Sequence, residues 1–142
     1  MIANCLKLQL RLDDDQARVM IFPLTTDHRL QRIEALTKLN PMPSTKATQA
    51  FNELRIVMRG IRAVRNNVVH AVLIEEEFIM RSNDRTFTKE QIFEGEELTN
   101  CAGILALTLR HELGDQDPAY NPPDPLPSRP AVPDFLKSYI GS

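Results

Sequence analysis

The chain has 142 residues, a size that suits one domain. Apolar residues make up 42% of it and charged residues 25%, the balance of a globular protein rather than of a disordered chain. The net charge of -2 at pH 7 excludes a protein that is basic throughout, such as a nucleic-acid coat protein. Any contact with phosphate must therefore come from a local basic surface.

Membrane and metal sites have no support in the sequence. No apolar run approaches the roughly 18 residues of a membrane span, and the first 15 residues lack the basic start and apolar length of a signal peptide. Cys5 and Cys101 stand without the spacing of a metal site or a disulfide framework. We therefore expect two buried free thiols in a cytoplasmic protein, with no membrane contact, no metal and no cofactor.

Helical patterns cover the first 39 residues. They lie in "ANCLKLQLRL" (3–12), "DQARVMIFPL" (15–24) and "DHRLQRIEALTKLN" (27–40), the last with apolar residues at three-residue steps. Pro23 is expected to bend or end the second helix, because proline has no amide hydrogen to donate. Asp27 is a candidate cap for the third.

A long central helix is expected next. The sequence "NPMPS" (40–44) marks a break, and Ser44 or Thr45 is a candidate N-cap for a helix that runs to about residue 75. The segment 75–91 then combines a short apolar run with the turn residues "SNDR", which indicates a small hairpin or an ordered loop.

The last helix is expected to begin after Thr88, which lies three residues before Gln91 as in a capping box. Gly95 is a point where this helix can divide, and Gly114 is a natural stop. The fold class is therefore all-α, an antiparallel helical bundle with a short hairpin or loop before its last helix.

A proline-rich segment (residues 117–142) closes the chain. Prolines are frequent from residue 118 to residue 133, which excludes both a helix and a central strand there. The alternatives are an extended strap on the helical body and a disordered tail, and the strap is our preferred interpretation. The predicted organisation is a helical domain over residues 1–116 and a proline-rich strap over residues 117–142, packed on that domain or extending from it.

The central helix carries a band of basic residues that we call the cationic strip. On a wheel of about 100° per residue, its members fall within about 40° of one direction: Arg55, Arg59, Arg62, Asn66 and His70. The opposite direction holds the expected core face: Val57, Ile61, Val64, Val68 and Ala71. Arg65 lies to one side, and no acidic residue interrupts residues 55–70.

The cationic strip has an ordinary explanation and a functional one. A charged helix face is usually a solvated surface. A surface built only for solvent commonly mixes both signs of charge, however, whereas arginines alone attract phosphate. His70 adds a side chain that exchanges a proton near neutral pH, and Asn66 lies one helical turn before it.

At "RNNVVH" (65–70) the chain resembles the HEPN superfamily, whose motif is an arginine followed after four to six residues by a histidine. Arg65 matches the arginine, Asn66 the polar residue that often follows it, and His70 the histidine. The resemblance covers about residues 25–113. It implies an α-helical bundle, a homodimer with facing motifs, and metal-independent endoribonuclease activity of the kind found in toxins and defence effectors.

The resemblance implies roles for these residues. His70 would be the general acid and base, Arg65 would stabilise the scissile phosphate, and Asn66 would orient His70 or hold a phosphate oxygen. Arg59 and Arg62 would bind RNA phosphates. An antitoxin or another protein partner would accompany such an enzyme.

The alternative is an inactive HEPN-like binding or scaffold module, since other members of the superfamily have lost activity. It would use the cationic strip for dimerisation or for docking a partner. Leu73, which the wheel places near the strip, is a candidate dimer contact if the protein is a ribonuclease, and the alternative is that it lies under the following loop.

Overall fold

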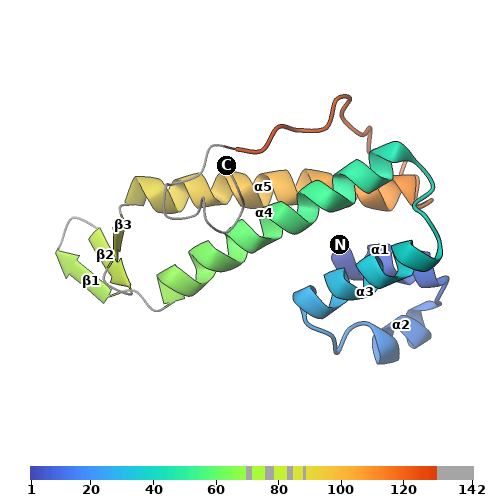
Figure 1. The fold of residues 1–142 in the computed structure, drawn as a ribbon, viewed down its shortest axis with the longest axis horizontal. Coiled ribbons are helices and arrows are strands. Elements are labelled where there is room, and N and C mark those ends of the chain that lie inside the picture. Colours follow the sequence, from blue (N-terminus) through green and yellow to red (C-terminus); the bar gives the residue numbers. More distant parts are fainter. Residues whose placement is uncertain (70–71, 76–78, 83–84, 88, 131–142) are drawn as a thin grey trace. The chain divides into compact units, whose positions relative to one another are not determined.

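The computed structural model of the protein describes residues 1–69, 72–75, 79–82, 85–87 and 89–130 (Figure 1). Helices dominate these residues, which confirms the predicted helical fold. The helices are α1 (Ile2–Leu10), α2 (Asp14–Met20), α3 (Thr26–Leu39), α4 (Thr45–Val69) and α5 (Lys89–Glu112). Three short strands lie between α4 and α5: β1 (Val72–Glu75), β2 (Ile79–Ser82) and β3 (Arg85–Phe87).

The chain divides into two compact units. The first contains Met1–Asn52 and Gly103–Pro127, and the second contains Glu53–Ala102 and the chain from Ser128 onward. Both long helices, α4 and α5, contribute residues to each unit. The predicted boundary between residues 116 and 117 stays a prediction.

Capping residues set the limits of α2. The Asp13 side chain accepts a hydrogen bond from the Gln16 amide at 2.8 Å, and the Gln16 side chain accepts one from the Asp13 amide at 3.0 Å. This reciprocal pair satisfies two amides that the first helical turn leaves without partners. The helix ends at Met20, ahead of Pro23, as predicted.

Thr25 caps α3, so the prediction that Asp27 caps it is wrong. The Thr25 hydroxyl accepts a hydrogen bond from the His28 amide at 3.3 Å. Because Thr25 already occupies the capping position, Asp27 lies inside the first turn. A carboxylate there still favours the helix, since the N-terminal end of a helix carries partial positive charge.

Helices α1 and α3 pack together in the first unit. Leu6 and Ile33 are essentially inaccessible to solvent, as is Ile21 after α2. Cys5 is also fully buried, its sulfur lies 3.7 Å from the Ala106 carbonyl oxygen, and burial raises the pKa of its thiol to about 12. Both Cys5 and Cys101 are free and buried, as predicted.

Ser44 is the N-cap of α4, one of the two predicted candidates. Its hydroxyl oxygen accepts a hydrogen bond from the Ala47 amide at 3.0 Å and donates one to Glu112 at 3.1 Å. Gly114 follows α5 with a φ of 115°, a conformation that glycine adopts without a steric penalty. The predicted stop is confirmed, and Gly95 lies inside a continuous α5 rather than dividing it.

In the second unit, α4 and α5 approach each other closely at Gly95. A Cβ atom at this position would lie 3.0 Å from Val64 Cγ1, nearer than ordinary packing allows. Leu54, Val57 and Leu98 are fully buried in the same unit. The absence of a side chain at Gly95 therefore permits this helix contact. The contact fixes the part of α4 that carries Arg65.

The three strands form an antiparallel sheet in the order β1, β2, β3. Residue Leu73 pairs with Met80, and Arg81 pairs with Thr86. The prediction of a helix to about residue 75 is therefore wrong, because α4 ends at Val69 and β1 begins at Val72. Two of the four residues of β1, Val72 and Ile74, are β-branched and favour the extended backbone.

Residues 117–130 of the proline-rich segment contain neither helix nor strand, as predicted. In the first unit, the Tyr120 hydroxyl lies 2.8 Å from the Thr108 hydroxyl and donates to the Ile104 carbonyl at 3.2 Å. In the second unit, Arg129 donates two hydrogen bonds to Glu53, at 3.0 and 3.2 Å. Residues 131–142 of this segment lie outside the described residues.

Candidate nucleic-acid interface

The cationic strip lies on an exposed side of α4 in the second unit. Arg59, Arg62 and Asn66 are all exposed, and so is Arg65 beside them. Arg55 at the start of the strip is half-buried. Exposure follows from the helical period, because the buried residues of α4 recur three or four positions apart on the other side: Ala47, Ala50, Leu54 and Val57.

The predicted core face is confirmed only in part. Val57 is fully buried, whereas Ile61 and Val64 are half-buried. Ala63, which borders the strip next to Arg59, is only 5% exposed. The strip therefore borders a buried residue on that side. The solvent-exposed side of α4 is narrower there than the wheel predicts.

Two arginines of this surface have no carboxylate partner among the described residues. Within the described part of the chain, Arg59 and Arg65 form no ion pair or hydrogen bond through their side chains. Glu53, the nearest preceding acid in the sequence, accepts hydrogen bonds from Nε and Nη2 of Arg129. The two free guanidinium groups are therefore available to an anionic partner, for which arginine offers a planar set of donors.

The structure describes only part of the segment that resembles the HEPN motif. Arg65 and Asn66 lie on the surface in the last turns of α4, which ends at Val69. His70 is the next residue in the sequence and lies outside the described residues. The structure therefore places Arg65 and Asn66 on the same exposed helix end. His70 is linked to them by the sequence alone.

Leu73 does not lie on the helix that carries the strip. It belongs to β1, where it pairs with Met80 of β2. The wheel position that made Leu73 a candidate dimer contact is therefore wrong, because the helical period does not extend past Val69.

An exposed acidic face on α5 is a feature that the sequence analysis missed. Glu90, Glu97 and Asn100 are exposed at spacings that place them on one side of the helix. Phe93, on the same side, is 48% exposed. The signal was available in the sequence, because "KEQIFEGEEL" carries its acids at helical intervals, opposite in charge to the strip on α4.

The thiol of Cys101 lies close to the Glu53 and Arg129 pair in the second unit. Burial raises the pKa of this thiol, the Glu53 carboxylate raises it further, and Arg129 opposes the shift. Cys101 is 6% exposed, so it is a protonated core residue rather than a nucleophile.

Within the described ranges, no group of three or more histidine, cysteine, aspartate or glutamate side chains is placed to hold a metal ion. No described helix has the combined length and apolar character that a membrane crossing needs. Comparisons with protein-family models, with curated proteins and with solved structures find no significant match to this chain.

Proposed function

We propose that the protein is a metal-independent endoribonuclease of the HEPN type that acts as a homodimer. The observation that carries the proposal is the pair Arg59 and Arg65, exposed on α4 and without a carboxylate partner among the described residues. An acidic protein that keeps such groups free has a surface suited to the phosphates of a nucleic acid. The resemblance of Arg65, Asn66 and His70 to the HEPN motif directs the proposal to RNA cleavage.

The reaction uses the 2′-hydroxyl of the RNA as the nucleophile. His70 of one subunit takes the proton from this hydroxyl as its oxygen attacks the adjacent phosphorus. Arg65 stabilises the negative charge of the phosphorane, and Asn66 positions His70 or holds a phosphate oxygen. His70 of the partner subunit protonates the departing 5′-oxygen as the phosphorus–oxygen bond breaks. The products are a 2′,3′-cyclic phosphate and a 5′-hydroxyl.

Arg59 and Arg62 hold the RNA backbone beside the cleavage site. They precede Arg65 at three-residue steps along α4, and at about 100° per residue each step turns the position by about 60° around the helix. Contacts to phosphate position the nucleic acid without reading its sequence. The binding step should therefore depend on salt and only weakly on base identity.

The change Arg59→Gln tests the binding step. In a His70→Ala background, which keeps the RNA intact, we expect about fivefold weaker binding of single-stranded RNA, because one phosphate contact is lost. The dependence of log Kd on log salt should also become shallower by about 0.7. Fluorescence anisotropy with a labelled RNA measures both quantities.

Arg32→Gln is the matched control for Arg59→Gln. Arg32 is an exposed arginine of α3, outside the cationic strip, and it should bind no phosphate of the RNA. Equal losses in the two variants would mean that RNA responds to total charge rather than to the strip, and the proposed binding role would be wrong.

The exposed acidic face of α5 favours a second candidate, a binding or scaffold module that dimerises through opposite charges. In a twofold dimer, the strip on α4 of each subunit would face Glu90, Phe93 and Glu97 of the other. We then expect Glu97→Lys to weaken the dimer about tenfold, while Asp15→Lys on α2 leaves it unchanged. Sedimentation velocity over a series of concentrations distinguishes these outcomes, and an unchanged Glu97→Lys dimer would reject this interface.

A further inference from the structure

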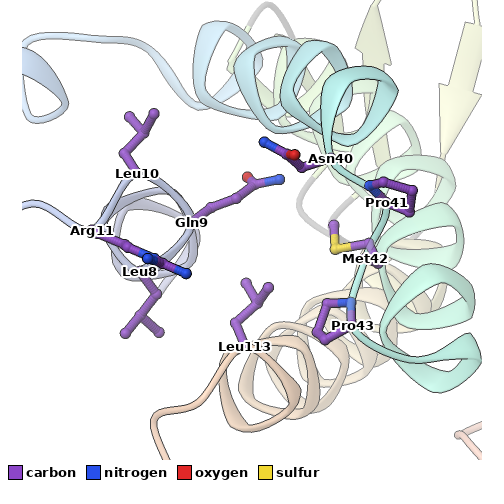
Figure 2. A pocket seen from close by; sticks show the side chains of 9 residues that line it. All are labelled: Leu8, Gln9, Leu10, Arg11, Asn40, Pro41, Met42, Pro43 and Leu113. Atoms are coloured by element: carbon purple, nitrogen blue, oxygen red, sulfur yellow. The ribbon is translucent and has the colours of Figure 1, made fainter.

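An open pocket of about 630 Å³ lies in the first unit, far along the chain from the cationic strip. Its walls come from residues 8–11 at the end of α1, from residues 40–43 between α3 and α4, and from Leu113 after α5 (Figure 2). This volume lies within the usual range for small-ligand sites. The pocket therefore has the capacity to hold one or two residues of a peptide.

Three polar side chains meet at this pocket. Figure 2 shows the side chains of Gln9 and Asn40 extending toward each other, and the Arg11 guanidinium directed toward the hollow from α1. The side-chain oxygen of Gln9 is buried, and no hydrogen-bond donor reaches it within the described residues. A terminal amide rotates over a broad torsional range, so this oxygen can turn to meet a ligand N–H group.

Arg11 supplies the positive charge of the pocket. Its backbone has a φ of 54°, and its amide closes α1 by donating to the Leu8 carbonyl at 3.2 Å, which fixes its position. The acids that follow it have other roles: Asp13 caps α2, and Asp14 pairs with Lys7. Arg11 itself has no acidic partner in the described part of the chain.

The remainder of the pocket is apolar. Met42 and Leu113 direct their side chains into the hollow, and Pro43 lies between them on the same wall (Figure 2). Proline fixes the backbone on this side, so the wall is formed before a ligand arrives. A flexible methionine side chain adapts to apolar groups of different shapes.

We propose that this pocket binds the C-terminal end of a peptide whose last residue is apolar. The terminal carboxylate pairs with Arg11, and the last side chain packs on Met42 and Leu113. The carboxamides of Gln9 and Asn40 bind the peptide backbone, which offers both N–H and C=O groups. A fatty acid would satisfy Arg11 and the apolar wall but leave both carboxamides without partners, so a peptide fits the set of groups better.

The test uses a fluorescein-labelled hexapeptide that ends in leucine with a free carboxylate, and fluorescence polarisation with the full-length protein. Amidation of the terminus, or the change Arg11→Gln in the protein, should each weaken binding about tenfold. Arg11→Lys should retain most of the affinity because it keeps the charge. Arg32→Gln on α3 is the matched control and should bind like the wild type, and a thermal melt of each variant verifies folding.

Several outcomes would overturn the proposal. Equal binding of the free and amidated peptides would show that Arg11 does not bind the terminal carboxylate. An Arg11→Gln variant that binds like the wild type would show the same. If a peptide that ends in glycine binds as tightly as the peptide that ends in leucine, the last side chain does not pack on the apolar wall. Octanoate that displaces the peptide as effectively as an unlabelled copy of it would assign the pocket to free organic acids, and no binding of the peptide at millimolar concentration would reject the site. The assay contains no RNA, so its result is independent of the proposed ribonuclease activity.

Discussion

The change His70→Ala is expected to lower the rate of RNA cleavage by at least about a hundredfold, the usual contribution of a positioned general acid or base. The reason is that both proton transfers in the proposed reaction pass through His70, one in each subunit. Cleavage of a labelled mixed-sequence RNA under single-turnover conditions measures the effect. Sedimentation velocity must show that the variant keeps the oligomeric state of the wild type.

His28→Ala provides the matched control for this substitution. His28 is an exposed histidine of α3, and only its backbone amide takes part in capping that helix. The variant should cleave RNA at the wild-type rate. Should His70→Ala retain full activity, the assignment of proton transfer to this residue would be wrong, even if the strip binds RNA.

Gly95→Leu is expected to reduce the free energy of unfolding by about 3 kcal/mol, at the upper end of the range for overpacked cores. A Cβ atom at this position already lies 3.0 and 3.3 Å from the two methyl carbons of Val64, so the rest of a leucine side chain forces α4 and α5 apart there. The substitution should also weaken RNA binding, because Val64 immediately precedes Arg65. Urea denaturation measures the first effect.

Gly103→Ala is the control for a glycine in the same helix. A Cβ atom at Gly103 meets nothing within 4 Å, so alanine should stabilise the protein by about 0.5 to 1 kcal/mol through its better helix propensity. Adding Val64→Ala to Gly95→Leu should recover part of the lost stability. A Gly95→Leu variant as stable as the wild type would show that α4 and α5 do not depend on this close approach.

Local signals in the sequence predict most helix limits. Ser44 caps α4 and Gly114 follows the end of α5, both as predicted. These roles were predictable because helix capping and a left-handed backbone depend on a few neighbouring residues. The cap of α3 was misassigned because Thr25 and Asp27 both suit a helix start, and only hydrogen-bond geometry distinguishes them. The end of α4 was misplaced because an apolar run such as "VVHAVLI" fits either a helix or a strand.

Features that depend on distant parts of the chain were not predictable. Strand β1 forms by pairing with β2, and that pairing takes Leu73 away from the helical surface. The pocket joins Gln9 and Asn40 to Leu113, residues that no local pattern connects. By contrast, the helical period predicted that Arg59 and Arg62 lie opposite the core face, and both are exposed because α4 remains regular through these positions.

The measurement that tests the central claim most directly is cleavage of a mixed-sequence RNA by the purified wild-type protein in EDTA, with analysis of the product ends. We expect cleavage that persists in EDTA and leaves 2′,3′-cyclic phosphate and 5′-hydroxyl ends, because the 2′-hydroxyl is the nucleophile and the proposed site uses no metal. An intact RNA at high protein concentration would contradict the ribonuclease proposal and would favour the binding module that the charges of α4 and α5 also support.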